Sequence, residues 1–326
     1  MKGTPAQQSY ALALLAGFAS GLVSVSAAHG GSGAILAYLT PLPLVSVGLT
    51  HGRLKVLIAA AAATLLVALA ANGAEAVLSA HLLLGSLPAL VVVFLALTRS
   101  SVGRERLGEA KGETAAWYPP GSVVAWLTVV ALVLTLVGCY ALPTGEGRIE
   151  TWIGYRVAHY IDETAPTASP EFRAITAKVW GAFLPALVGV GWLMLAVVNG
   201  LVGLWVAVKS GYSLRPSPDF LALTVPRWLL APLVIAASIG IFAGGDAGYL
   251  ARNAAALLLT PYVFLGMTVM HRVLRRRSDG GILLPLFYVV FFLLFGWAMV
   301  VLAGIGLVKQ WTGLRRQDKA DSQEEQ

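Results

Sequence analysis

The sequence predicts an all-α protein, a polytopic bundle of eight or nine transmembrane helices. Apolar residues make up 57% of its 326 residues and charged residues only 12%, whereas soluble domains have about 45–50% and about 25%. The mean hydropathy is +0.76, so the chain has too little polar surface to cover a globule in water. Its apolar residues fall in runs of about 20, the length of a membrane-spanning helix. We expect a single integral membrane domain over residues 1–314 and a disordered tail over residues 315–326.

Nine apolar segments follow one another along the chain, separated by polar or glycine-rich connections. The sixth helix is expected to begin before its apolar run, because Ser169 can cap a helix whose first residue is Pro170. The outer loop over residues 143–177 contains apolar residues at helical spacing, which is typical of an interfacial helix. The nine segments are residues 9–28, 34–50, 54–72, 75–97, 121–142, 178–208, 228–243, 248–271 and 282–308.

Two prolines, Pro41 and Pro43, interrupt the second segment. Neither can donate the helical hydrogen bond to the carbonyl four residues earlier, so we expect this segment to be broken or partly re-entrant. A functional interpretation is that the freed backbone groups face a substrate near the middle of the membrane. A structural interpretation is that the helix bends and its carbonyls are paired by the hydroxyls of Thr40 or Ser46.

The basic residues predict a cytoplasmic N-terminus. Together with the N-terminal lysine, the connections that follow an even number of segments carry 14 lysines and arginines, whereas the opposite side carries five. Membrane proteins show this bias between their cytoplasmic and external loops. A nine-span count would place the basic residues of the tail outside. Either the tail is external, or one segment, most naturally the proline-interrupted second, does not cross.

The search for catalytic, metal and cofactor motifs is negative. The sequence has no GxxxxGK[ST] loop for ATP and no HExxH metal motif. Cys139 is the only cysteine, so the chain can form neither an intramolecular disulfide nor a thiolate cage. The five histidines lie in different segments, and the net charge of +7 is spread over loops. We therefore expect no enzyme activity, no catalytic residues, no cofactor, no metal site and no nucleic-acid partner.

Polar residues at membrane depth are the remaining candidates for a binding site, because burying them in hydrocarbon is costly. Asn199 is the deepest of them, but an interhelical hydrogen bond would also explain it. His81 could equally be a packed histidine, and Glu75 and Arg252 could form an ion pair. The weak binding candidates are Asn72, Glu75, His81, Asn199, Arg252 and Asn253.

Two further patterns indicate contacts. Ala13, Gly17 and Gly21 recur every four residues, so they place small side chains on one face of the first helix. Such a face lets another helix approach closely, either from the same chain or from a membrane protein partner. A basic cluster after the eighth segment is expected to bind anionic lipid headgroups of the bilayer. Its members are Arg272, Arg275, Arg276 and Arg277.

Several short stretches of the sequence have a recognisable pattern. In the N-terminal half these are LTPLPLVSVGLTHG (residues 39–52) and LLLGSLPALVVVF (residues 82–94). In the second half they are LTVPRWLLAPL (residues 223–233), FLGMTVMHRVLRRR (residues 264–277) and the Gly313-Leu314-Arg315 that closes the last span. Together these stretches resemble the YybS-like family of uncharacterised bacterial membrane proteins.

The outer loop over residues 143–177 has no counterpart in the family pattern. The resemblance implies a bacterial cytoplasmic (inner) membrane location. It also implies a fold similar to the membrane-embedded substrate-binding components of energy-coupling-factor vitamin transporters. Those proteins bind a vitamin among their helices and dock, through small residues on the first helix, onto a partner that carries the ATPase. The family has no assigned substrate, so it implies no particular binding residues.

We expect a transporter-like small-molecule-binding component that lacks its own ATPase. One alternative is a non-transporting scaffold or assembly protein that holds partners in the membrane. A further alternative is a membrane enzyme that acts on a lipid. A polar pocket lined by Asn199, His81 and Arg252 would favour binding, a tightly packed interior would favour the scaffold, and a groove open to lipid would favour the enzyme.

Overall fold

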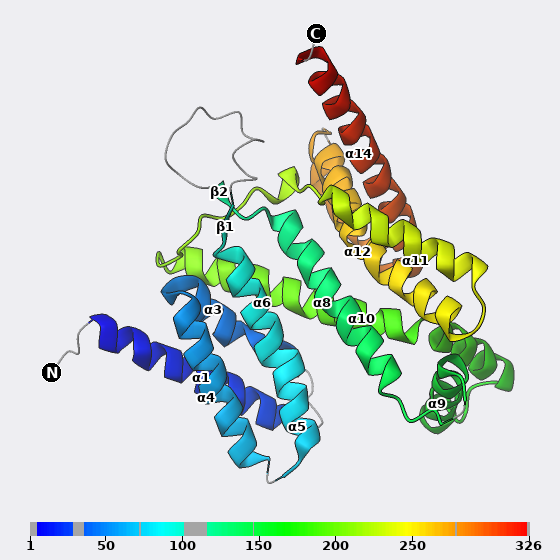
Figure 1. Cartoon of the computed structure of the whole chain (residues 1–326), viewed down its shortest axis with the longest axis horizontal. Helices are drawn as coiled ribbons and strands as arrows, with labels where there is room; N and C mark the ends of the chain where they lie inside the picture. Colours follow the sequence, from blue (N-terminus) through cyan, green and yellow to red (C-terminus); the bar gives the residue numbers. More distant parts are fainter. Residues whose placement is uncertain are drawn as a thin grey trace. The chain divides into compact units, whose positions relative to one another are not determined.

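A computed structural model describes the chain in six stretches. In these stretches the protein is helical, with turns and one pair of two-residue strands, so the predicted all-α class is confirmed (Figure 1). The chain divides into two compact units. It passes from one unit to the other within two of its helices and again after residue 219. Unit 1 comprises residues 1–127 and 192–219, and unit 2 comprises residues 128–191 and 220–326. The described stretches are residues 5–28, 36–71, 73–100, 116–145, 147–277 and 279–324.

Unit 1 contains the helices of the N-terminal third of the chain. Its two strands pair antiparallel, with Arg99 opposite Trp117. Its elements are α1 (Pro5–Ala28), the 3-10 turn η1 (Ala37–Leu39), α3 (Pro41–His51), α4 (Arg53–Ala70), α5 (Glu75–Ala80), the π-helix η2 (His81–Ser86), α6 (Leu87–Ala96), β1 (Arg99–Ser100), β2 (Ala116–Trp117), the start of α8 (Pro120–Tyr140) and the end of α10 (Pro170–Lys209).

The small face of α1 packs against α4, which lies beside it in Figure 1. Ala13 is fully buried. A Cβ atom added at Gly17 would lie 2.4 Å from the carbonyl oxygen of Ala59, and one at Gly21 would lie 3.1 Å from that of Ala63. The contacting residues advance in the same direction along both helices, so α1 and α4 run parallel. The face predicted for a helix contact is therefore covered by the same unit and is not open to a partner protein.

The proline-interrupted segment returns the chain between these two parallel helices. Its helical part, α3, has 11 residues, about 16 Å of helix, against a hydrocarbon core of about 30 Å. Pro41 is the first residue of α3, where a helix needs no amide donor. Just before it, the Thr40 carbonyl accepts a hydrogen bond from Ser20, about two turns before α1 ends. The predicted break is thus the start of a half-length helix inside the bundle.

One end of unit 1, which we call the basic end, gathers three connections. Arg53 donates to the carbonyl of Phe94 at 2.9 Å, and Arg215 donates to that of Ala96 at 3.0 Å. Leu214 donates its backbone N–H to Leu49 at 3.0 Å. Burial lowers the pKa of the Arg215 guanidinium, which interacts favourably with the C-terminal dipole of α6. We call the opposite end, where α1 ends and α5 begins, the far end.

Unit 2 contains the remaining helices. Ser169 accepts a hydrogen bond from the backbone N–H of Phe172 at 3.2 Å, and α10 begins at Pro170, so this predicted helix start is confirmed. The elements of unit 2 are the end of α8, α9 (Ile149–Thr164), the start of α10, the 3-10 turns η3 (Phe220–Ala222) and η4 (Arg227–Leu229), α11 (Leu230–Phe242), α12 (Gly245–Arg275), α13 (Gly280–Leu293) and α14 (Phe295–Glu324).

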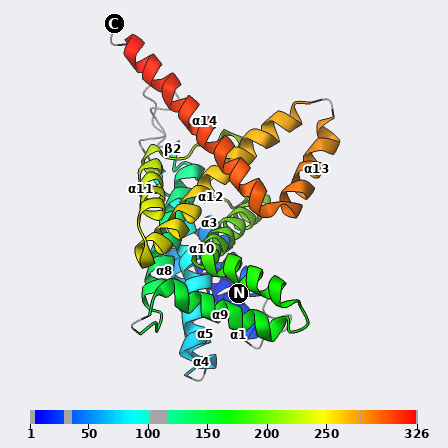
Figure 2. The same cartoon turned by 90° about the vertical axis from the view of Figure 1, so that its right-hand side faces the viewer.

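The most extensive packing in unit 2 is between α12 and α14, which cross each other in Figure 2. Added Cβ atoms at Gly266 and Gly306 would each lie 2.0 Å from a carbonyl oxygen of the facing helix. Arg272 and Lys309 both donate to carbonyls of residues 221–223. The C-terminal parts of α12 and α14 therefore leave the crossing in the same direction. The helix of α14 continues to Glu324, past residue 314, after which the sequence predicted a disordered tail.

The predicted count of eight or nine spans is not confirmed. In the described stretches, six helices are long and apolar enough to cross a membrane, and a seventh span results if the pair Gly280–Leu293 and Gly296–Gly313, bent by 119°, is counted as one. Hydropathy counted the second and seventh segments as spans, but α3 and α11 have only 11 and 13 residues. Apolar composition does not reveal where a helix begins, so hydropathy alone does not distinguish these short helices from full spans.

Candidate binding site

A group of uncharged polar side chains is buried inside unit 1, among helices that are otherwise mostly apolar. Their exposed fractions run from 0% to 9%. They come from α1, the break before α3, the π-helix η2 and the end of α10, so four elements converge on them. The group, which we call the unit 1 site, consists of Ser20, Ser24, Thr40, His81, Ser86 and Asn199.

The backbone carbonyls at the break are paired by side chains from other helices. Asn199 donates its Nδ2 to the carbonyl of Tyr38 at 2.8 Å, and Ser20 donates its hydroxyl to that of Thr40 at 2.8 Å. The carbonyl of Ala37 accepts the backbone N–H of Thr40 at 3.2 Å. Two of the carbonyls at the break are therefore paired by side chains of α1 and α10.

The π-helix η2 is a second irregular backbone segment at the same place. The indole of Trp192 donates to the carbonyl of Leu83 at 2.7 Å, within a turn whose widened geometry leaves a backbone group without its usual partner. A Cβ atom at Gly85 would lie 2.5 Å from Thr40 Cγ2 and 3.1 Å from His81 Nδ1. Only glycine lets the π-helix approach the break this closely. π-helical turns are frequent at functional sites.

His81 connects the π-helix to α1 through hydroxyl groups. Its Nδ1 lies 2.7 Å from Ser24 Oγ, and its Nε2 lies 3.1 Å from Ser86 Oγ. A serine hydroxyl can donate or accept, so either neutral tautomer of the ring is satisfied. The imidazole is 2% exposed, and the two hydroxyl groups that it contacts carry no charge. His81 is therefore held as a neutral, fully paired side chain.

Asn199 is the one member of the unit 1 site with an unused polar atom. Its Nδ2 donates to Tyr38 and, at 2.8 Å, to the carbonyl of Leu195. These two acceptors fix the orientation of the amide, because its oxygen would repel both carbonyls. Its Oδ1 is buried without a hydrogen-bond partner, which costs about 1–3 kcal/mol. Asn199 thus offers an acceptor that a bound molecule with an O–H or N–H group can satisfy.

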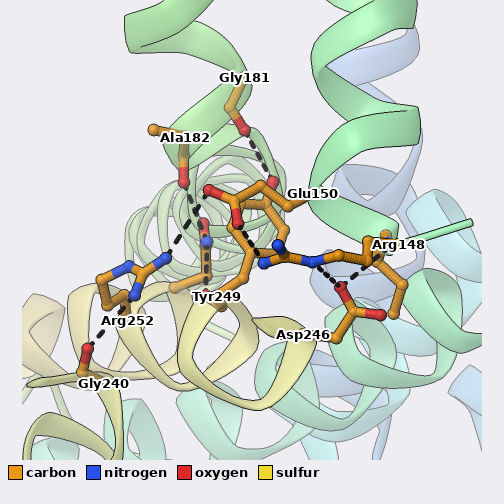
Figure 3. Close-up of polar contacts among 10 residues, drawn as sticks. Arg148, Glu150, Gly181, Ala182, Gly240, Asp246, Tyr249 and Arg252 are labelled. Atoms are coloured by element: carbon orange, nitrogen blue, oxygen red, sulfur yellow. Dashed lines mark hydrogen bonds and ion pairs between the residues drawn. The ribbon is translucent and has the colours of Figure 1, made fainter. Parts of the chain in front are cut away.

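Unit 2 places its polar candidates in a different setting, at the start of α12 (Figure 3). Arg252 lies 3.7 Å from Glu150 on α9, and Arg148 lies 3.2 Å from the same carboxylate. Asp246 accepts the backbone N–H of Ile149 at 3.0 Å, so it caps α9. These contacts fasten α9 to α12. Within unit 2, the acidic partner of Arg252 is Glu150.

Asn253 and Tyr249, one turn apart on α12, repair the kink at Pro185 in α10. Pro185 cannot donate to the carbonyl of Gly181, which instead accepts the Tyr249 hydroxyl at 2.7 Å. One turn further on, the Asn253 amide donates to the carbonyl of Ala182 and accepts the N–H of Ala186, both at 3.0 Å. Those are the two backbone groups that an uninterrupted helix would pair with each other. Asn253 therefore has a packing role.

The structure separates the predicted site residues. His81 and Asn199 meet in the unit 1 site, whereas Arg252 and Asn253 serve the packing of unit 2. Glu75 is exposed at the start of α5, and Asn72 lies outside the described residues. Ser20, Ser24 and Ser86 were not predicted as site residues. The four-residue spacing of Ser20 and Ser24 within an apolar helix was a signal that could have found two of them.

Known proteins supply no template for this site. No protein-family model, curated protein or solved structure matches the chain. Within the described residues, no group of three or more histidine, cysteine, aspartate or glutamate side chains could hold a metal ion. The chemistry of the unit 1 site therefore follows from its hydroxyls, its imidazole and the amide of Asn199.

Proposed function

We propose that the protein is a small-molecule-binding component of a membrane transporter, without an ATPase of its own. The bacterial cytoplasmic membrane, and a basic end that faces the cytoplasm, are parts of the same proposal. They follow the resemblance to the YybS-like family and the distribution of basic residues. The observation that carries the proposed function is the buried, unpartnered Oδ1 of Asn199 beside the broken segment.

Two irregular backbone segments support a binding site at this position. In transporter folds, discontinuous helices near mid-membrane direct backbone and side-chain groups at the substrate. Here the half-length helix α3 and the π-helix η2 meet at Gly85, and Asn199 lies over the break. A protein that only holds partners together has no need for an acceptor buried at a cost in stability.

Unit 2 supports the alternative, a non-transporting scaffold, for its own part of the chain. Its kink is repaired by Tyr249 and Asn253, and α9 is fastened to α12 by ion pairs. We propose that this unit provides structural support and that its arginine cluster, Arg272 and Arg275–Arg277, binds anionic lipid headgroups. A partner ATPase would dock on a surface other than the buried Ala13 face.

The test compares bound small molecules in three purified proteins. The wild type, Asn199→Leu and Gln310→Leu are purified in mild detergent, and the extracted compounds are identified by mass spectrometry. Gln310 is the matched control, because its amide donates to the carbonyl of Val225 at 2.9 Å in unit 2. We expect one compound that is retained by the wild type and Gln310→Leu and reduced at least tenfold in Asn199→Leu. Equal retention in all three proteins, or no compound in any, would refute the proposal.

A further inference from the structure

We infer that the unit 1 site takes an uncharged ligand that donates a hydrogen bond to Asn199 Oδ1, and that this ligand enters from the far end along Ser24, His81 and Ser86. This inference rests on the proposed function and specifies the chemical class of the ligand and its route. Neither follows from the resemblance or from the amino-acid composition. Three observations carry it: the charges around the site, the hydrogen-bonding state of Asn199 and the packing on each side of the break.

The ligand is uncharged because the site offers it no counterion. The members of the unit 1 site are hydroxyls, one amide and a histidine that is paired only with hydroxyls. The charged residues of the described part of unit 1 lie at its ends, such as Arg53 and Arg215 at the basic end and Glu75 at the far end. Bringing an ion into this interior without an opposite charge would carry a large desolvation penalty.

The ligand is a donor because Asn199 can only accept. Its Nδ2 donates to two carbonyls, those of Tyr38 and Leu195, so both Nδ2 hydrogens are used. The remaining atom, Oδ1, is an acceptor without a donor. A hydroxyl, amide or ring N–H of a neutral molecule supplies what is missing. A molecule with acceptors alone would leave Oδ1 unpaired and would gain no hydrogen bond there, so it would bind more weakly than a donor.

The route is assigned by the packing on the two sides of the break. Toward the basic end, α3 fills the interior: Leu44 and Val45 are fully buried, and a Cβ atom at Gly203 would lie 2.6 Å from Val45. Toward the far end, polar groups continue. Ser24 lies about one turn before α1 ends, and it leads through His81 to Ser86. A polar molecule therefore meets a connected set of buried hydrogen-bonding side chains along the far-end route.

The test uses the single cysteine of the chain. In a Cys139→Ala background, cysteines are introduced by Ser24→Cys and Ser86→Cys on the far-end route. Ser46→Cys is the control, because Ser46 is a half-buried position of α3 on the basic-end side of the break. Tyr140→Cys, where the native side chain is 74% exposed, calibrates the reagents. The probes are hydroxyethyl, trimethylammonioethyl and sulfonatoethyl methanethiosulfonate, which are neutral, cationic and anionic, applied to the full-length protein in detergent.

We expect the neutral reagent to modify Ser24→Cys and Ser86→Cys at least tenfold faster than Ser46→Cys. At Ser86→Cys, the rate of modification by the neutral reagent should also be at least ten times that by either charged reagent. Each rate is first divided by the rate of the same reagent at Tyr140→Cys. Comparable rates for a charged reagent would overturn the ligand class, and comparable rates at Ser46→Cys would overturn the route. If Ser24→Cys does not fold, Ser20→Cys on the same face of α1 replaces it. The failure of this test leaves the Asn199-dependent retention of a compound unaffected, so the two proposals fail separately.

Discussion

The two units of this protein each contain a proline interruption and an asparagine beside it, but they use the asparagine differently. At Pro185 in unit 2, both polar atoms of Asn253 are bonded to backbone groups of the kinked helix. At Pro41 in unit 1, Asn199 uses its nitrogen on the break and leaves its oxygen unpaired. A buried polar group without a partner is costly, so the difference separates a repaired kink from a site that is completed by something else.

The comparison also shows why depth in the membrane is a weak guide to function. Asn199 and Asn253 are 3% and 2% exposed, so burial alone does not distinguish them. Their hydrogen-bond partners do. A candidate is therefore better judged by whether each of its donors and acceptors is satisfied than by its position along an apolar segment.

The largest expected effect is that of Asn253→Leu. The substitution removes the amide that bonds both Ala182 and Ala186, and it leaves those backbone groups unpaired beside Pro185. We expect the free energy of unfolding to fall by about 2–4 kcal/mol. Unfolding by sodium dodecyl sulfate in mixed micelles measures it, with Gln310→Leu as the control for the loss of one side-chain amide. A loss no larger than that of Gln310→Leu would show that the kink needs no repair.

The next effect is that of Gly17→Leu, which tests whether the small face of α1 is internal. A Cβ atom there would lie 2.4 Å from the carbonyl oxygen of Ala59, and forced helix separation costs about 1–3 kcal/mol. We expect a lower yield of folded protein by gel filtration in detergent. Gly191→Leu is the control, because nothing lies within 4 Å of a Cβ atom at that position. A well-folded Gly17→Leu protein that loses a partner would instead show that the face serves another chain.

A smaller effect is expected for Tyr249→Phe. The ring stays in place, and only the hydrogen bond to the carbonyl of Gly181 is lost. We expect a decrease of about 1 kcal/mol in the free energy of unfolding, measured in the same micelles. A loss equal to that of Asn253→Leu would mean that the hydroxyl, and not the amide, is the main repair of the kink.

The smallest effect is expected for Glu150→Gln, which removes the ion pair between Glu150 on α9 and Arg252 on α12. The side chains of Glu150 and Arg252 are 39% and 44% exposed, and exposed ion pairs contribute about 0–1 kcal/mol. We expect the difference from the wild type to shrink as sodium chloride is raised, because salt screens such pairs. A salt-independent loss above this range would show that the carboxylate has another role.

The sequence predicted the helical class, the start of α10 at Pro170 and the position of the break at Pro41. These features depend on neighbouring residues, through capping and missing donors. It could not predict the partners of the break, since Asn199 is 161 residues from Tyr38. Nor could it separate Asn199 from Asn253, which look alike in apolar surroundings. The predicted number of spans is not confirmed, because hydropathy does not show that α3 has only 11 residues.

The central claim is that Asn199 in unit 1 keeps an unpaired hydrogen-bond acceptor, whereas both polar atoms of Asn253 in unit 2 are hydrogen-bonded. Unfolding free energies of Asn199→Leu and Asn253→Leu, measured side by side in the same micelles, test it most directly. Asn199→Leu loses two donor contacts but also removes an orphaned acceptor, so we expect a net change within about 1 kcal/mol. Asn253→Leu should lose about 2–4 kcal/mol. Equal losses in the two variants would contradict the claim, because they would show that Asn199 is as fully used in packing as Asn253.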